Sequence, residues 1–509
     1  MYRKLKTLKD TYITDKLIRT TRRLTSNVGM AGTLDLFKLY GVNSSGSFTG
    51  SVGELSRLLI KFDLSELHAL TSSILNLNDD SFQCFINLKN VMHSQPTPSN
   101  FTLTVFPLSR SFDEGIGKDI VYFNDIDSAN FLTSSFVSSL ELWNLSGANN
   151  GGLLGSSNID YISSGNLNDG NGVVDLSVSQ VFSTGTENLL VDVTKIISAT
   201  LVNTLPDHGF RIAYTASLEN NTNSYFVKRF GSQQSYNVAL RPELIVKYND
   251  TIQSHEGDFF FDLSGSLFLF NYDRNGLANL TSGSALTSIT GSSCLKLNLW
   301  TTGTSGLVST TITASQHQVG DNFITGIYSA SFALNSTNTN FKPLLLASSS
   351  VLFYPFWGSL DDTVGYLSGS TFSVSRPNRT TYRNAPKNLT ISVTNMKSTY
   401  LSTDTPRFRI FVQNNEAPVV ASKLPLVRKS MILTNLHYSI RDTQTGEIFI
   451  PFDVATNSTL LSTDSDGMYF DLFMTDLIIG KTYTIDILNQ DGDVNHIFTD
   501  IGTKFRVDK

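Results

Sequence analysis

The chain has 509 residues, of which 40% are hydrophobic and only 16% are charged, and its formal net charge is −6. At roughly 150 residues per domain, this length predicts about three domains, each able to bury a core without disulfides or metals. The low charge, with basic residues grouped only at 3–9 and 22–23, argues against broad electrostatic binding of nucleic acid. No apolar run reaches the ~18 residues that a membrane-spanning helix needs, so we expect no membrane partner.

The N-terminal residues are basic and lack the apolar stretch of a secretory signal. Such a signal needs roughly 7–15 apolar residues before a cleavage site, and residues 1–24 supply none. We expect residues 1–9 to form a short arm, either solvated or in contact with a neighbouring subunit. The strand patterns described below are those of β-sandwich proteins that act outside the cell. A protein of that kind without an export signal is typical of a bacteriophage virion, which assembles in the host cytoplasm and leaves by lysis. The alternative is a cytosolic β-rich protein.

Short stretches with period-2 alternation predict strands along residues 1–250. In the stretch 57–65, Leu58, Ile60, Phe62 and Leu64 share one apolar face. The same alternation recurs in three further stretches, 101–105, 210–214 and 244–248. A weak helical pattern covers residues 191–205, and the Gly-, Asn- and Ser-rich residues 145–173 predict a long inserted loop.

Two further segments predict smaller domains. Residues 251–385 hold apolar strand-like runs such as CLKLNLW and VLFYPFW. A turn-prone Asn384-Ala385-Pro386 junction leads to residues 386–509, where strand signals at about 8–12 residue spacing favour an immunoglobulin- or fibronectin-like sandwich. The expected fold is therefore all-β and multidomain: a jelly-roll β-sandwich in 1–250, followed by two smaller β-sandwiches in 251–385 and 386–509.

Residues 10–249 carry a series of short motifs in a distinctive order. The longest is Ser-Arg-Leu-Leu-Ile-Lys-Phe-Asp-Leu-Ser at 56–65, and the others lie at 10–13, 26–29, 113–117, 191–194, 208–210 and 241–248. This order resembles the DNRLRE, or disaggregatase-related, family. The resemblance implies a jelly-roll sandwich with an ancestral glycan-binding surface, and it implies no catalytic residues. Phe112 stands where the family has tryptophan, and the insertion after Asp119 has no counterpart there.

The C-terminal segment contains motifs that suit many small sandwiches, at 437–442, 445–453 and 464–471. They resemble the C-terminal modules of structural proteins from marine tailed phages. The resemblance implies a virion protein, which agrees with the N-terminal expectation.

The sequence has few candidate catalytic or metal-binding residues. The seven histidines show no metal-ligand spacing, and Cys84 and Cys294 are expected to be buried free thiols rather than a disulfide. A glycosidase takes an acid and a nucleophile from distant strands, so Asp113-Glu114 and then Asp361-Asp362 are the carboxylate candidates. Loop positions at the rim are the favoured interpretation of both pairs. We therefore expect no enzyme activity, no catalytic residues and no cofactor.

Two acidic turns offer oxygen ligands for calcium, one with Asp464 and Asp466 and the other with Asp491 and Asp493. Neither continues into an EF-hand pattern, and turns between strands are the favoured interpretation. Charged Arg57, Lys61 and Asp63 lie beside the apolar face of 57–65 and are expected to form cross-strand pairs.

Exposed aromatic side chains are the remaining candidate ligand contacts. Trp143, beside the Gly/Asn-rich loop, is the favoured sugar contact, with Trp300 and Trp357 as the other tryptophans. The cluster Phe353, Tyr354, Phe356 and Trp357 predicts a core or a subunit interface.

The sequence favours a structural protein of a tailed bacteriophage virion, in the tail, neck or a fibre. Its expected partners are other virion proteins and further copies of itself in a homo-oligomer. The alternative is a carbohydrate-binding adhesin that attaches to a bacterial surface glycan. A glycan-depolymerising enzyme is the weakest of the three hypotheses.

Overall fold

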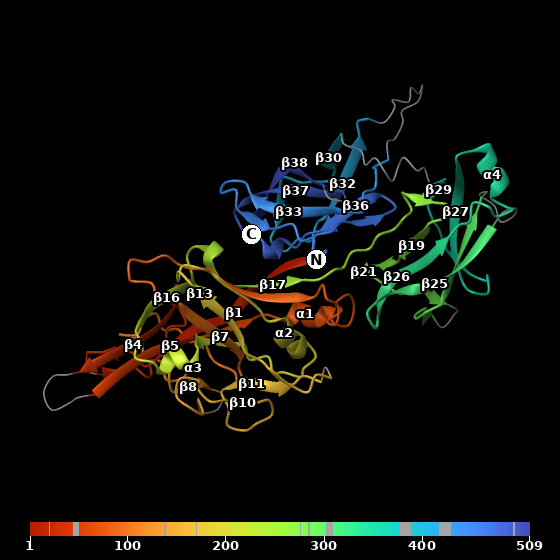
Figure 1. Cartoon of the computed structure of the whole chain (residues 1–509). Coiled ribbons are helices and arrows are strands. Elements are labelled where there is room, and N and C mark those ends of the chain that lie inside the picture. The colour runs from red at the N-terminus through yellow and green to blue at the C-terminus, as the bar shows by residue number, and fades with distance from the viewer. Residues whose placement is uncertain are drawn as a thin grey trace. The chain divides into compact units, whose positions relative to one another are not determined.

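A computed structural model describes residues 1–19, 21–43, 50–136, 139–168, 170–274, 276–282, 286–301, 309–376, 388–416, 429–491 and 494–509 (Figure 1). The chain is all-β and multidomain. It divides into two compact units, which we call the first unit, Arg3–Ala69 with Phe82–Lys247, and the second unit, Met1–Tyr2 with Leu70–Ser81 and Tyr248–Lys509.

The first unit is a β-sandwich-like domain with three short α-helices among its described residues. Its strands are β1 Tyr2–Thr14, β2 Leu17–Ile18, β3 Thr21–Arg22, β4 Thr33–Asn43, β5 Gly50–Phe62, β6 Gln83–Leu88, β7 Phe101–Pro107, β8 Thr133–Phe136, β9 Leu140–Leu142, β10 Gly151–Leu153, β11 Tyr161–Asn166, β12 Val173–Asp175, β13 Val178–Phe182, β14 Leu189–Asp192, β15 Phe210–Tyr214, β16 Tyr225–Gly231 and β17 Glu243–Lys247. The helices are α1 Ser65–Leu70, α2 Thr194–Leu201, α3 Ala216–Asn220 and the 3₁₀ turn η1 Val238–Leu240. Helix α2 falls within the weak helical pattern at 191–205.

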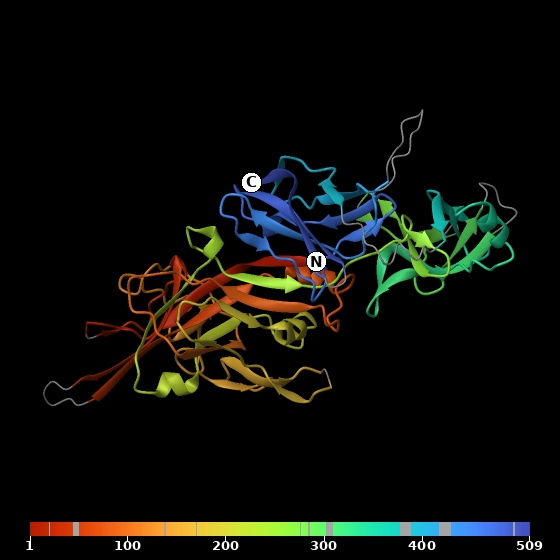
Figure 2. The same cartoon turned by 45° about the horizontal axis from the view of Figure 1, so that its top comes forward.

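The main sheet follows the order β13-β7-β15-β5-β1-β17-β6-β14, and β4 joins β5 to β16. Strands distant in sequence are therefore neighbours, as in a sandwich with long crossover connections. Strands β4 and β5 form a long hairpin that projects from the body of this unit in both views (Figures 1 and 2). The alternation predicted in 57–65 is present: Leu58, Ile60 and Phe62 are all buried.

The expected N-terminal arm is wrong. Residues 2–14 form the single strand β1, whose second half pairs with β5 from Lys9↔Lys61 to Thr14↔Ser56. Arg3 is buried, and its guanidinium donates to Glu66 at 2.7 Å. Tyr2 and Leu5, which stand on either side of Arg3 and Lys4 in the sequence, are also buried. The segment is therefore a strand whose basic residues form ion pairs, such as Arg3 with Glu66 and Lys9 with Asp113, and not an arm that is solvated or docked on a neighbouring subunit.

The opposite face of β5 is also buried, because side chains from the segment between Leu108 and Ala148 pack over it. Leu59 and Ile13 contribute to a cluster with Leu108, Phe112 and Trp143. The predicted loop at 145–173 is wrong in part, since β10, β11 and β12 form a three-stranded sheet there. Glycines allow close contacts in this sheet: a Cβ on Gly152 would lie 2.5 Å from Ile159.

The second unit begins with a β-sandwich-like set of strands that share one core. Its described elements are β18 Phe259–Phe260, β19 Ser264–Phe270, β20 Tyr272–Asp273, β21 Gly276–Leu277, β22 Thr281–Ser282, β23 Thr287–Ser288, β24 Leu295–Trp300, β25 Ser309–Val319, β26 Asn322–Ala333, α4 Lys342–Ala347, β27 Ser350–Gly358, β28 Gly365–Ser368 and β29 Phe372–Ser375. The larger sheet follows the order β18-β29-β27-β24-β25-β26-β19, with β28 on β27. Strict alternation puts Leu295, Leu297 and Leu299 of β24 in the core and leaves the intervening side chains on the outer face.

The C-terminal strands form a four-stranded and a five-stranded sheet. They are β30 Leu389–Val393, β31 Thr399–Leu401, β32 Arg407–Asn414, β33 Leu436–Asp442, β34 Ile448–Ile450, β35 Ser462–Asp464, β36 Gly467–Asp471, β37 Thr482–Asp491 and β38 Val494–Asp508, with a 3₁₀ turn η2 at Met474–Asp476. The Phe408 ring on β32 packs 5.3 Å from Phe470 and 5.6 Å from Phe505 of the other sheet. These aromatic contacts bury the inner faces of both sheets, as in a small sandwich. The predicted junction at 384–386 lies outside the described residues.

Candidate functional site

Three segments of the first unit meet around a pair of carboxylates. The Oε1 atom of Glu114 accepts a hydrogen bond from the Asp10 backbone N–H at 3.0 Å and another from the Gln233 side-chain amide. The Oδ2 atom of Asp10 accepts from the Gln233 backbone N–H at 2.6 Å. Asp10 lies on β1, Glu114 on the loop after β7, and Gln233 on the turn after β16. The pair therefore ties two loops to the central strand.

The side chain of Asn27 fixes the loop that carries Glu114. Its Nδ2 donates to the Glu114 carbonyl at 2.8 Å and to the Ala129 carbonyl at 2.9 Å. Its Oδ1 accepts from the backbone N–H of Gly117 at 2.8 Å. A Cβ on Gly117 would lie 1.8 Å from the Asn27 carbonyl oxygen, so only glycine fits there. The predicted motifs at 10–13, 26–29 and 113–117 thus converge on one structural network.

Burial raises the pKa of both carboxyl groups in this pair. Desolvation raises the pKa of Asp10 to about 8, and it also raises the pKa of Glu114. Among the described residues, none donates a hydrogen bond to the buried Oδ1 atom of Asp10, which disfavours a full negative charge there. The charge on Glu114 also raises the pKa of Asp10, as expected when two carboxylates lie close together. This geometry supports a structural role, because Asp10 is fully buried.

Asp113, the neighbour of Glu114, points to the surface. Its Oδ1 pairs with the Lys9 ammonium at 3.2 Å, and its Oδ2 accepts from the Phe136 backbone N–H at 3.1 Å. Asp113 and Glu114 are therefore engaged in different contacts, one half-exposed and one within the network. The structure places this carboxylate pair in positions that hold the loop.

The contact with Phe136 leads to an exposed apolar hairpin. Phe136 and Leu140 are directly paired across β8 and β9, and Leu142 lies two residues further on the same face. Their side chains are 47%, 43% and 57% exposed. We call these three residues the apolar hairpin face. This face was not among the predicted sites, although the alternation of Leu140, Glu141 and Leu142 is a sequence signal for it.

The interpretation of Trp143 as a sugar contact is wrong. Trp143 is only 5% exposed and belongs to the cluster that covers β5. Its indole N–H donates to the Asn130 carbonyl at 2.9 Å. Both the ring and its polar group are thus used inside the fold, because the insertion that carries Trp143 folds back onto the sheet.

The charged residues on and directly after β5 have partners, but the expected cross-strand pairing is wrong, because Glu219 lies on helix α3, Asp207 lies in the loop before β15, and Asp63 binds the start of α1. Arg57 is buried and makes two hydrogen bonds of 2.9 and 2.8 Å to the carboxylate of Glu219. Its Nη1 donates to the Gly147 carbonyl at 2.6 Å, which fastens the 145–173 insertion to the sheet. Lys61 pairs with Asp207 at 3.1 Å, and Asp63 accepts from the Ser65 backbone N–H at the start of α1.

The second carboxylate candidate, Asp361-Asp362, lies on an exposed loop of the second unit. Asp361 accepts from the hydroxyls of Ser359 and Thr363, and Asp362 pairs with Lys296 at 2.6 Å. Of the nearby aromatic cluster, Phe353 and Trp357 are in the core, as predicted. Tyr354 and Phe356 are half-buried on the outer face of β27.

The calcium candidate at 464–466 is a turn that joins β35 to β36, with Asp464 paired to Gly467 in register. Asp464 accepts from Arg409, and Asp466 lies 3.5 Å from the same guanidinium. Asp493 lies outside the described residues, and Asp491 ends β37. In the described part of the chain, no group of three His, Cys, Asp or Glu side chains is placed to hold a metal ion.

We expect Asp466→Asn to leave the stability of the C-terminal sandwich almost unchanged. Asp466 is 76% exposed, and exposed ion pairs contribute about 0–1 kcal/mol. Thermal unfolding of the variant and the parent protein, each with and without millimolar Ca²⁺, measures this directly. A calcium-dependent rise in the melting temperature that is lost in the variant would reveal a site at this turn.

Both cysteines are free thiols, Cys84 buried and Cys294 half-buried. The prediction of free cysteines is thus confirmed, although only Cys84 is fully enclosed. Burial raises the pKa of both thiols, so neither has the character of an activated nucleophile.

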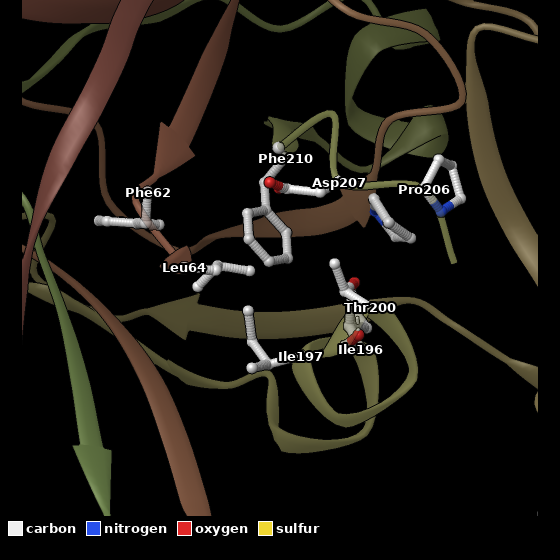
Figure 3. A pocket seen from close by; sticks show the side chains of 10 residues that line it. Phe62, Leu64, Ile196, Ile197, Thr200, Pro206, Asp207 and Phe210 are labelled. Atoms are coloured by element: carbon white, nitrogen blue, oxygen red, sulfur yellow. Dashed lines mark hydrogen bonds between the residues drawn. The ribbon is translucent and has the colours of Figure 1, made fainter. Parts of the chain in front are cut away.

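Cavities among the described residues are modest. One in the first unit has about 10 Å³ and is lined by side chains such as Leu64, Ile197 and Phe210, which point toward one another (Figure 3). This volume is the least that holds a single water. Two cavities of the second unit, of about 150 and 220 Å³, share Phe270, Tyr272 and Arg407. Arg407 is already paired with Asp471 at 2.9 Å there.

No protein-family model matches the chain, and no curated protein matches it. Among solved structures, trypsin-activated alpha-2-macroglobulin from Escherichia coli is 9% identical over 91% of this chain, with a TM-score of 0.15. The match spans 23% of the length of that protein. The FN1–FN3 domains of chicken CNTN1 are 9% identical over 64% of this chain and 79% of that one, with a TM-score of 0.14. Identities of 9% and TM-scores of 0.15 and 0.14 do not assign the chain to a family.

No described helix combines the length and the apolar character needed to cross a bilayer.

Proposed function

We propose that this protein is a structural component of a tailed bacteriophage virion and acts through protein–protein contacts of its first unit. The observation that carries the contact role is the apolar hairpin face of Phe136, Leu140 and Leu142. Contiguous exposed apolar side chains rimmed by polar residues are typical of interaction surfaces. The resemblance of residues 437–471 to phage modules supports the virion setting, and the all-β multidomain architecture is compatible with it.

The segment that follows Asp113 carries further exposed apolar side chains. Ile116 and Tyr122 are 75% and 83% exposed, and they follow the loop whose Asp113 binds the Phe136 backbone. The loop itself is held by the Asn27 network, so the apolar side chains have a rigid base. A rigid base lowers the conformational entropy lost on binding. Binding to exposed side chains on a fixed loop is therefore more favourable than binding to the same side chains on a mobile loop.

We expect the double variant Leu140→Asp/Leu142→Asp to fold but to enter assembled particles at least about tenfold less than the parent protein. A tenfold loss of affinity corresponds to ~1.4 kcal/mol, and burying two carboxylates in an apolar contact costs more than that. Quantitative mass spectrometry of purified particles gives the ratio. The control is Leu190→Asp, which changes a leucine of β14 that is 54% exposed. Equal incorporation of the double variant and the control would exclude the apolar hairpin face as the contact.

A further inference from the structure

The outer face of the β24–β27 sheet carries a row of partly exposed aromatic side chains. Trp300 on β24 is directly paired with Tyr354 on β27, and Phe356 lies one pleat along β27 on the same face. The rings of Trp300 and Phe356 are stacked, with centroids 4.9 Å apart and planes inclined by 16°. All three side chains are half-buried, and Trp357 and Phe353 point into the core instead.

Polar groups border these rings in fixed positions. Asn298 is directly opposite Phe356 in register, and its Oδ1 accepts from the Thr311 hydroxyl at 2.7 Å. Lys296, two residues further along β24, binds Asp362 at 2.6 Å. Neighbouring side chains on one face of a strand are two residues apart, which is about 6.6 Å. The polar groups of Asn298 and Lys296 therefore lie about one sugar-ring width from the aromatic rings.

We propose that this outer face binds a neutral pyranose polysaccharide. A pyranose ring has C–H groups on its faces and hydroxyls around its edge, so it needs aromatic surface beside side chains that both donate and accept hydrogen bonds. Trp300, Tyr354 and Phe356 supply the first, and Asn298, Thr311 and the Lys296–Asp362 pair supply the second. Aromatic side chains with few rotatable bonds offer such a surface at low entropic cost.

The charge on this face favours a neutral polysaccharide over an acidic polymer. Lys296 and Asp362 neutralise each other, so the face offers no net positive charge to a nucleic acid or an acidic polymer. The Trp300–Phe356 stack also holds both rings in place before a ligand arrives. This site is independent of the proposed assembly role, since it uses residues of another unit.

The test is affinity electrophoresis of the full chain in gels that contain purified neutral polysaccharides: an α-glucan, a β-glucan, a mannan and a galactan. We expect at least one of them to retard the parent protein. Trp300→Leu, which keeps an apolar side chain without a ring, should weaken binding at least about tenfold, a loss of ~1.4 kcal/mol. Trp300→Phe should retain most of the binding, and Leu346→Ala, which removes a side chain that is 74% exposed on α4, should leave it unchanged.

Tryptophan emission gives a second measurement that needs no variant. Of the three tryptophans, Trp143 and Trp357 are buried, so a ligand on this face perturbs the emission of Trp300. A saturable change in emission with the retarding polysaccharide supports the site. No retardation by any of the four, undiminished binding by folded Trp300→Leu, or binding with unchanged emission overturns it. A Trp300→Leu chain that binds the polysaccharide normally but is lost from particles marks the face as an assembly contact and also overturns it.

Discussion

Replacing Arg57 with methionine is expected to lower the free energy of unfolding of the first unit by about 3–5 kcal/mol, the usual cost of breaking a buried ion pair from one side. The side chains of Arg57 and Glu219 are 3% and 8% exposed. Methionine would leave the Glu219 carboxylate and the Gly147 carbonyl without their donor. Because that carbonyl belongs to the 145–173 insertion, the insertion should loosen together with the sheet.

Hydrogen-exchange mass spectrometry in increasing urea measures this effect on β5 peptides, separately from the second unit. Lys61→Met is the matched control, since Lys61 lies on the same face of β5 in a pair with 22% and 36% exposure. Its expected cost is below about 1 kcal/mol. The double variant Arg57→Met/Glu219→Leu should recover much of the loss, because it leaves no buried charge behind. Equal costs for Arg57→Met and Lys61→Met would contradict the buried-pair account.

The stability of the first unit is expected to fall as the pH rises from about 4 to 8, and Asp10→Asn should abolish most of this dependence. The pKa of Asp10 is raised from 3.8 to about 8 in the folded chain, so the folded state binds a proton that the unfolded state has released across this range. Stability from such a group is fully present at low pH and is lost as the pH approaches 8. At about 1.4 kcal/mol per pKa unit, the change amounts to at most roughly 4 kcal/mol between pH 4 and 7.

Urea unfolding of parent and variant at pH 5, 6, 7 and 8 tests this prediction. The Asp10→Asn chain should be the more stable of the two at pH 8, and the two curves should converge at low pH. Asp113→Asn, at the half-exposed neighbour of Glu114, should keep the slope of the parent protein. A parent protein whose stability rises between pH 5 and 8 would show that Asp10 is ionised in the fold.

The strands themselves were predictable because alternation is a local property. Leu58, Ile60 and Phe62 on one face of β5, and Leu295, Leu297 and Leu299 on β24, follow directly from a period of two. Leu59 was the missed signal, because it is an apolar residue on the face of β5 that was expected to be polar, and side chains such as Leu108, Phe112 and Trp143 cover it. Sequence spacing gives no information about which distant segment covers a sheet face, and Trp143 was misassigned for the same reason.

The candidate sites depend on contacts between residues that are far apart in sequence. Asp10, Asn27 and Glu114 were each noted as parts of separate motifs, and only the fold shows that their hydrogen bonds form one network. Trp300 and Phe356 are separated by more than fifty positions and become neighbours through the antiparallel register of β24 and β27. Treating residues 353–357 as one cluster hid the division between the core side and the outer side of the strand.

The proposed role as a virion component is tested most directly by mass spectrometry of density-gradient-purified particles from the lysate of a producing culture. We predict peptides from all three predicted segments of the chain at a constant ratio to the major capsid protein, retained through repeated gradients and high-salt washing. Their absence from intact particles, with the full-length chain recovered only from the soluble fraction, would contradict the account.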